Sequence, residues 1–286
     1  MRIAVAQISS CGDPLKNLEL VERFGQDAAK GGAELVVFPE ATMCAFGNDL
    51  YPIAEPLNGP WANRVREMAI GLGIVMVVGM FTPGSGHRVK NTLLAVGPEV
   101  DNSYDKVHLF DAYGYKESDS VEPGTRPVTF ALNGHTVGLA TCYDIRFPAL
   151  FTASAGMGAT INIVCASWGA GENKIEQWSL LTQARALDST SFVIACGQAD
   201  PTTLGIPRVG NAPTGVGHSA VVSPLGQVIL QLSAEPSLAF VDIDPNEVED
   251  VRLKLPVLAN AHSFLPPPTQ SDRATDGASK NGRGLL

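Results

Sequence analysis

The sequence predicts an α/β protein arranged as a four-layer αββα sandwich, with two similar β-sheets packed face to face and helices on the outside. Apolar, strand-like runs alternate with segments whose apolar residues recur at helical spacing, a pattern typical of layered α/β folds. The order strand, helix, strand, helix, strand, strand occurs twice, once in each half of the chain. The prediction depends on this order of elements, because the halves show no strong sequence repeat.

The first half opens with a short apolar strand and a helix whose two ends are both marked. Asp13 and Pro14 form a typical pair of N-cap and first-turn proline, and Gly31 and Gly32 follow where the helical spacing ends. The predicted elements of this half are strand 2–8, the helix between Asp13 and Gly31, strand 34–39, helix 60–72, and strands 74–81 and 92–96.

The second half repeats that order after a hairpin. Asn133-Gly134 is a strong turn signal between strands 128–132 and 136–141. The later elements are predicted to be helix 148–157, strand 160–166, helix 174–188, and strands 191–197, 218–222, 228–232 and 237–243, the last completing the second sheet. The inward face of helix 174–188 is predicted to consist of Ile175, Trp178, Leu181 and Leu187.

The two halves are expected to form one domain, residues 1–265. Lys106, a candidate site residue, lies in the connection between the halves, so neither half is expected to function alone. Residues 266–286 begin with three prolines and continue with Ser, Thr, Gly and charged residues, which predicts a flexible tail.

Composition excludes several classes of partner. The net charge of −9 argues against nucleic acid or an anionic membrane surface as a partner. No apolar run approaches the length of a membrane span, and the N-terminus is too short for a signal sequence, so we expect a cytoplasmic protein. The five cysteines form no CxxC pair, which argues against a disulfide framework and against a zinc site. We therefore predict no metal.

Three chemically reactive side chains are expected at strand ends. Glu40 follows strand 34–39, Lys106 lies within a strand-like run, and Cys142 follows the buried strand 136–141. Sites assemble at strand ends in layered α/β folds, and an acid, an amine and a thiol together can perform nucleophilic chemistry. Taken singly, a cysteine can be core, a glutamate a helix N-terminal charge and a lysine a solvated surface group. Spacing alone leaves open whether the three meet.

Four short motifs occur in order along the chain. They are Phe-Pro-Glu at 38–40, Lys-Val-His-Leu-Phe-Asp at 106–111, Lys-Glu-Ser at 116–118 followed by Pro-Gly at 123–124, and Cys-Tyr-Asp-Ile-Arg-Phe-Pro at 142–148. This ordered set resembles the nitrilase superfamily of carbon–nitrogen hydrolases, over roughly residues 2–256. The resemblance implies the same αββα fold, and implies that residues 1–265 are a carbon–nitrogen hydrolase domain.

The resemblance also implies a role for each polar site residue. Cys142 is the nucleophile, and Glu40 accepts its proton and later protonates the departing ammonia. Lys106 stabilises the oxyanion of the tetrahedral intermediate, with the backbone N–H of Tyr143 as a second donor. Glu117 positions the lysine and the leaving amine. This chemistry requires no metal and no organic cofactor.

The Cys-Tyr-Asp-x-Arg-Phe-Pro motif resembles the Nit-type amidases, which act on ω-amides of 2-oxo acids or on deaminated glutathione. This implies a small-molecule amide substrate that carries a carboxylate, and a homodimer or higher homo-oligomer. Trp168 is a candidate pocket wall, and Arg208 and Lys174 are candidates for binding the carboxylate. Ser167-Trp168-Gly169 and Ser179 depart from these relatives, so the substrate itself is left open.

Several alternatives remain at this stage. An N-carbamoyl amino acid hydrolase would release carbon dioxide as well as ammonia, and a binding protein that kept the fold would release neither. A Cys–His dyad would use His108 or His218, although we expect His108 to make a structural hydrogen bond. A redox sensor would need Cys165 or Cys196 as a resolving thiol.

Arg146 follows the nucleophile motif closely and needs its own assignment. Because acidic residues lie near it in the sequence or the expected site, we predict an internal ion pair with Asp144 or Glu40 rather than a contact with substrate.

Overall fold

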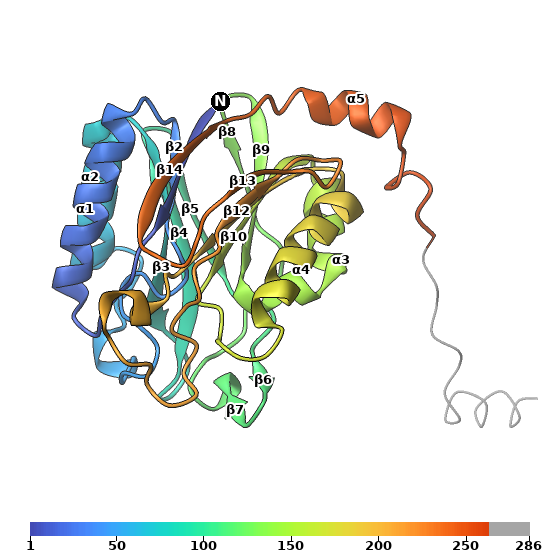
Figure 1. The fold of residues 1–286 in the computed structure, drawn as a ribbon. Coiled ribbons are helices and arrows are strands. Elements are labelled where there is room, and N and C mark those ends of the chain that lie inside the picture. The colour runs from blue at the N-terminus through green and yellow to red at the C-terminus, as the bar shows by residue number, and fades with distance from the viewer. Residues whose placement is uncertain (263–286) are drawn as a thin grey trace, which may run out of the picture.

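The computed structural model describes residues 1–262 and contains two six-stranded mixed sheets packed face to face, with helices on both outer faces (Figure 1). The first sheet has the order β14 (Ser237–Asp242), β1 (Arg2–Gln7), β2 (Leu35–Val37), β3 (Val75–Pro83), β4 (Val89–Gly97), β5 (Val100–Asp105). The second has the order β13 (Val228–Gln231), β12 (Ala220–Val222), β11 (Phe192–Gly197), β10 (Ala159–Ala166), β9 (His135–Thr141), β8 (Thr129–Leu132). The predicted four-layer αββα class is confirmed.

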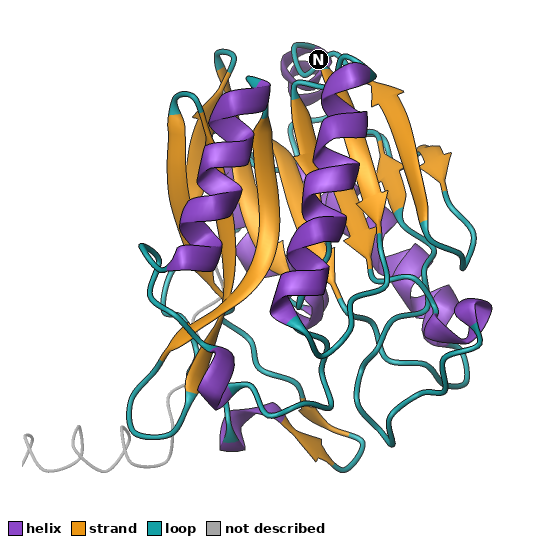
Figure 2. Cartoon of the chain, turned by 90° about the vertical axis from the view of Figure 1, so that its left-hand side faces the viewer, coloured by secondary structure: helices purple, strands orange, loops and turns teal. Residues whose placement is uncertain are grey.

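Two pairs of helices form the outer layers. Helices α1 (Pro14–Lys30) and α2 (Pro60–Leu72) cover the first sheet, as Figure 2 shows from that side. Helices α3 (Pro148–Gly156) and α4 (Lys174–Ser189) cover the second. The Asp13 carboxylate accepts hydrogen bonds from the first turn of α1, so the predicted cap is present.

Alternate side chains of the strands enter two different cores. Ile3 and Val5 of β1 point between the sheets, whereas Ala4 and Ala6 face the α1–α2 layer. Both faces of the central strands are therefore buried, which explains their nearly continuous apolar composition.

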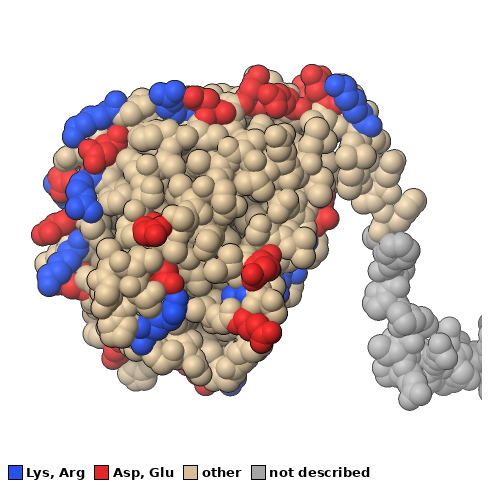
Figure 3. Space-filling model, in the orientation of Figure 1, with Lys and Arg blue, Asp and Glu red and all other residues tan. Residues whose placement is uncertain are grey.

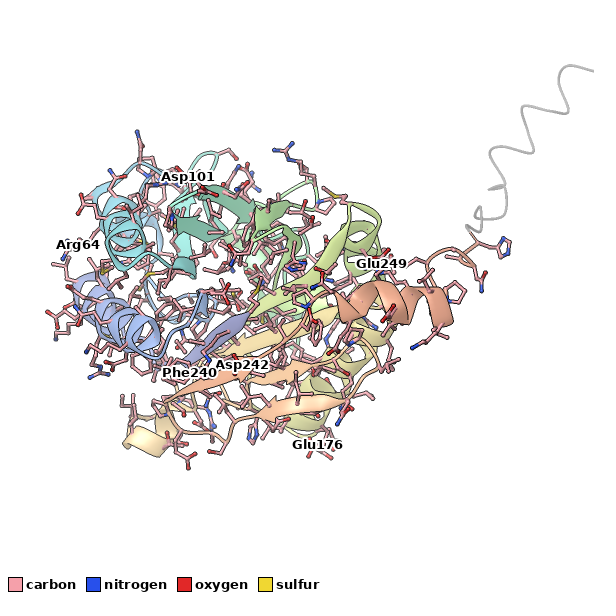
Figure 4. All side chains as sticks on the ribbon, turned by 90° about the horizontal axis from the view of Figure 1, so that it is seen from above. Arg64, Asp101, Glu176, Phe240, Asp242 and Glu249 are labelled. Atoms are coloured by element: carbon pink, nitrogen blue, oxygen red, sulfur yellow. The ribbon has the colours of Figure 1, made fainter. Side chains whose placement is uncertain are left out.

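The last strand is a correction to the sequence prediction. β14 does not complete the second sheet but returns to the first, antiparallel to β1, with Arg2 opposite Asp242. Figure 4 labels Phe240 and Asp242 on this strand. The Arg2 guanidinium pairs with Asp242 at 2.8 Å, and the Phe240 ring lies so close to Gly31 that a Cβ there would approach it to 2.3 Å.

Other elements were not predicted. They are the 8-residue helix α5 (Glu247–Lys254) and the hairpin of β6 (Asp111–Ala112) and β7 (Tyr115–Lys116). Strand β5, part of a strand-like run in the sequence, extends the first sheet beyond β4. The predicted tail 266–286 lies outside the described residues.

The predicted inward face of α4 was partly wrong. Trp178 is buried, but Ile175 and Leu187 are 40% and 42% exposed. The buried stripe of α4 instead includes small and polar residues such as Ala186 and Arg185, whose guanidinium donates to the Ile145 carbonyl at 2.8 Å. Small and polar residues thus occupy much of the buried face of α4, where an apolar periodicity predicts large aliphatic side chains.

Charged residues of both signs are interspersed over the face seen in Figure 3, with no concentration of Lys and Arg. No helix within residues 1–262 is long and apolar enough to cross a membrane.

Gly79 of β3 is the point at which the sheet touches the turn that carries Glu40. A Cβ at Gly79 would lie 2.6 Å from the Ala41 nitrogen and 2.8 Å from the Pro39 oxygen. Gly79 also donates to the Pro39 carbonyl at 3.2 Å, and its own carbonyl accepts from the Met43 N–H at 2.9 Å. Only a residue without a side chain permits this backbone approach.

We therefore expect Gly79→Ala to lower the free energy of unfolding by about 1–3 kcal/mol, as overpacked cores do. Gly71→Ala is the matched control, because a Cβ at this position in α2 meets nothing within 4 Å. The free energy of unfolding of that variant should rise by about 0.5–1 kcal/mol because of improved helix propensity. Urea unfolding of the two variants measures both values. Equal free energies of unfolding would show that the chain accommodates a Cβ at position 79 without loss of stability.

Candidate active site

The predicted site residues come from the ends of strands in both sheets and meet in one place. Glu40 follows β2 and Lys106 follows β5 of the first sheet, while Cys142 follows β9 of the second. All three line one pocket, together with Glu117 from the segment after β7. The structure therefore supplies the proximity that spacing in the sequence left open.

Lys106 lies between two carboxylates. Its Nζ is 3.0 Å from Glu40 Oε1 and 2.8 Å from Glu117 Oε2. The exposed fractions are 0% for Glu40, 2% for Lys106 and 1% for Glu117, so no solvent screens this triad. One ammonium thus faces two carboxylates in a buried space, which leaves an excess of one negative charge.

Two further donors hold the Glu40 carboxylate, and neither was singled out from the sequence as a site residue. Asn91 of β4 donates to Glu40 Oε1 at 2.7 Å and to Glu117 Oε1 at 3.2 Å. The backbone N–H of Ser167, after β10, donates to Glu40 Oε2 at 2.7 Å. A polar Asn within the apolar run of β4 was the available signal for the first, whereas a backbone donor leaves none.

Cys142 occupies a strained turn. Its φ is +48°, a left-handed conformation that few residues other than glycine adopt. Asp144 stabilises this turn by accepting from the Thr141 N–H at 2.8 Å and the Tyr104 hydroxyl at 2.7 Å. It also accepts from the His108 N–H at 2.9 Å and lies 2.7 Å from His108 Nδ1. One buried carboxylate therefore joins the turn that carries Cys142 to the segment that carries Lys106.

Burial determines the protonation of the site. Desolvation raises the pKa of Glu40 above its ordinary value, although Lys106 opposes the shift. Desolvation and then the charge of Glu40 raise the pKa of the Cys142 thiol well above 9.0. For Lys106, burial is outweighed by Glu117 and Glu40, so its pKa is raised well above 10.5. The resting site contains a thiol and an ammonium, and the thiol needs a base to become a nucleophile.

The pocket around these groups is small and mostly aromatic on its outer side. The space within its lining, including the open mouth, is about 380 Å³. Apart from the catalytic candidates, its lining comprises Phe46, Phe110, Tyr115, Tyr143, Ser167, Trp168, Gly169, Lys174 and Pro213. The predicted pocket residues Tyr143 and Trp168 are both present. The role of the Tyr143 N–H as an oxyanion donor stays a prediction.

Arg208 lies elsewhere. It lines a larger outer hollow next to the catalytic pocket, where its guanidinium pairs with Asp200. Lys174 lines both spaces. Of the two predicted carboxylate-binding residues, only Lys174 therefore borders the catalytic pocket.

The prediction for Arg146 was wrong. Within residues 1–262 it forms no ion pair with Asp144 or Glu40. Its guanidinium donates to Gln177 Oε1 at 2.5 Å and lies 5.2 Å from the centre of the Trp168 ring. The Asp144 oxygens are occupied by other donors, which explains why no ion pair forms.

The histidines do not join the site. The expected structural hydrogen bond of His108 is present, since its ring contacts Asp144 and stacks on Phe147 with centroids 3.7 Å apart. His218 contributes a backbone carbonyl that accepts from the Trp178 indole at 2.9 Å. Neither lines the pocket around Cys142, so the geometry gives a Cys–His dyad no support. Within residues 1–262, no group of His, Cys, Asp and Glu side chains could hold a metal ion.

Comparison with known proteins agrees with this site. The carbon–nitrogen hydrolase family model matches residues 2–253. A protein named only as a hydrolase from Mycobacterium tuberculosis is 52% identical over 93% of this chain and 97% of its own length. The deaminated glutathione amidase of Escherichia coli O157:H7 is 32% identical over 93% of this chain and 99% of its own length. The chain therefore belongs to the carbon–nitrogen hydrolase family and is an enzyme of that class.

Solved structures show the same fold. A CN-hydrolase superfamily protein from Xanthomonas campestris, with an arsenic adduct in its active site, superposes with a TM-score of 0.80 at 24% identity, covering 93% of this chain and 99% of that one. A mutant amidase from Nesterenkonia, with acrylamide added to its active-site cysteine, gives a TM-score of 0.75 at 27% identity, covering 89% of this chain and 98% of that one.

The charge balance of the triad makes a testable prediction about stability. Lys106→Met leaves two carboxylates buried without a cation, which should cost about 3–5 kcal/mol near neutral pH. Without the Lys106 charge, the folded-state pKa of Glu40 rises further in this variant, so the loss is full above that pKa. As the pH falls through it, the folded protein takes up protons, and the loss shrinks.

Lys116→Met is the control, because Lys116 is exposed and pairs at the surface with Asp119. It should change stability by no more than about 0.5 kcal/mol at any pH. Urea unfolding at about pH 8 and about pH 5.5 measures both variants. A loss for Lys106→Met that does not depend on pH would mean that Glu40 is already protonated in the wild type.

Proposed function

We propose that this enzyme hydrolyses a non-peptide C–N bond in a small, carboxylate-bearing amide, through a thioester on Cys142 with release of ammonia. The observation that carries the proposal is the burial of a thiol, an ammonium and two carboxylates in one pocket. A carboxylate with a raised pKa is a competent base for a neighbouring thiol.

In the first half-reaction, Glu40 accepts the Cys142 proton as the sulfur attacks the amide carbonyl carbon. The carbonyl π electrons move to oxygen, and the resulting oxyanion is stabilised by the Lys106 ammonium and the Tyr143 N–H. The C–N bond then breaks, and Glu40 returns the proton to the nitrogen, which leaves as ammonia. Glu117 keeps Lys106 in place through contacts of 2.8 and 3.0 Å.

In the second half-reaction, Glu40 removes a proton from water, which attacks the thioester. The C–S bond breaks, the sulfur regains the proton, and a carboxylic acid is released. All three catalytic groups return to their starting protonation states. The sequence of steps requires no metal or organic cofactor.

The nearest alternative is an N-carbamoyl amino acid hydrolase, which would use the same groups and release carbon dioxide as well. We also propose, from the sequence, that the protein is a homo-oligomer and that it is cytoplasmic. Light scattering of the purified chain tests the first of these.

Ammonia release across a panel tests the function directly. The panel comprises ω-amides, neutral amides, N-carbamoyl amino acids and nitriles. We expect turnover of the ω-amides, and essentially none in Cys142→Ala, which removes the nucleophile. Cys11→Ala is the matched control, because Cys11 is exposed and is not among the residues that line the pocket. Undiminished ammonia release by Cys142→Ala would contradict the nucleophile assignment, and release of carbon dioxide would favour the carbamoyl alternative.

The raised pKa of Glu40 predicts the acid side of the pH profile. Protonated Glu40 cannot accept the thiol proton, so kcat/KM should fall as the pH drops through a midpoint above the ordinary value of 4.5. Asn91→Ala removes a donor to the ionised carboxylate and should move this midpoint to still higher pH. Asn63→Ala, at an exposed position of α2, should leave it unchanged. An acid limb at or below the ordinary value would exclude Glu40 as the base.

A further inference from the structure

Lys174 occupies an unusual electrostatic position at the mouth of the catalytic pocket. It is the first residue of α4, and its carbonyl accepts from the Trp168 indole at 2.8 Å. Its ammonium lies 4.4 Å from the ring centre of Tyr113, 5.4 Å from that of Phe110 and 5.6 Å from that of Trp168. The β6–β7 hairpin, which presents Tyr113, lies beside the start of α4 (Figure 1). Three aromatic faces thus hold the lysine in place.

Nothing else in the described chain neutralises this cation. Lys174 forms no ion pair within residues 1–262, although Glu172 lines the same outer hollow. Its place at the N-terminal end of a 16-residue helix is unfavourable for a positive charge. Burial, and then the nearby Arg146, lower the pKa of Lys174. Ring contacts stabilise a cation only modestly, so the site favours an added negative charge.

The two neighbouring arginines are already engaged. Arg208 pairs with Asp200, and Arg146 donates to Gln177. Lys174 is also common to the linings of the catalytic pocket and the outer hollow. A substrate that extends from Cys142 into the outer hollow therefore passes Lys174 together with Phe110 and Tyr115, which also line both spaces.

We propose that Lys174 is the residue that selects carboxylate-bearing amides, by binding the distal carboxylate at the junction between the catalytic pocket and the outer hollow. This inference rests on the proposed amidase function and assigns its specificity to one side chain. The rings of Tyr113, Phe110 and Trp168 fix the ammonium and exclude water from one side of it. The carboxylate supplies the counter-charge that the protein itself does not.

The first test compares substrates of equal carbon number that carry either a carboxylate or a methyl group at the distal end. Glutaramate and pentanamide are one pair, and succinamate and butanamide are another. The wild type should favour the carboxylate member in kcat/KM by roughly tenfold or more, as one charge-assisted hydrogen bond allows. Lys174→Met should remove most of that preference, mainly by raising KM for the carboxylate member of each pair.

Charge reversal makes the test sharper. Lys174→Glu should disfavour glutaramate and should favour 5-aminopentanamide, a cationic amide of the same length. Arg208→Met is the control, because Arg208 lies in the outer hollow and is paired. It should retain the preference of the wild type. Preference retained in Lys174→Met but lost in Arg208→Met would overturn the proposal and assign the carboxylate to Arg208.

A second test does not depend on amide turnover. The rates at which N-iodoacetylglycine and neutral N-iodoacetylglycinamide alkylate Cys142 are followed by peptide mass spectrometry, with exposed Cys11 as an internal reference. The ratio of the alkylation rate at Cys142 to that at Cys11 should be higher for the acid than for the neutral amide. Lys174→Met should make the two ratios equal. Lys174→Gln is tested beside Lys174→Met as a second variant without the charge. A circular dichroism spectrum of each variant shows whether it is folded.

The two tests separate failure of the inference from failure of the function. If no amide is hydrolysed but the excess alkylation by the acid depends on Lys174, the anion site stands and the amidase proposal falls. If amides are hydrolysed and neither preference changes in the Lys174 variants, the amidase proposal stands and this inference is wrong.

Discussion

The site depends on one interaction, the contact of the buried Lys106 ammonium with the buried carboxylates of Glu40 and Glu117. Burial of any of these charges alone would cost several kcal/mol. The two carboxylates together carry one more charge than the single ammonium neutralises. Burial, with a smaller contribution from the charge of Glu117, raises the pKa of Glu40, and the two carboxylates raise the pKa of Lys106 still further from neutrality. Glu40 is thus suited to accept and release a proton, while Lys106 stays a fixed cation.

The rest of the fold positions this triad against a thiol from the other sheet. The Ser167 N–H, at the end of β10, donates to Glu40 and so joins the second sheet to the first at the site. Asp144 holds the left-handed turn of Cys142 and binds the backbone of His108, two residues after Lys106. Strain at Cys142 is therefore maintained by hydrogen bonds of Asp144, one of which also reaches the segment after β5 of the first sheet.

Local signals in the sequence predicted much of this arrangement. The cap at Asp13 and the periodicity of α2 placed those helices correctly, because both signals act within a few residues. The motifs named the four polar site residues through their resemblance to a family. The partner of β14 was mispredicted because a strand pattern does not specify which sheet edge it joins. Arg146 was mispredicted, and Asn91 was not found, because their partners are set by packing between distant segments.

The most direct test of this account is the protonation state of Lys106 itself. ¹⁵N NMR of lysine side chains, with the Lys106 signal assigned from its absence in Lys106→Arg, follows that state during a pH titration. The account predicts an ammonium that does not titrate between about pH 5 and about pH 10, below the ordinary lysine value. A Lys106 amine that loses its proton near neutral pH would contradict it, because that lysine would then be the base and Glu40 would not.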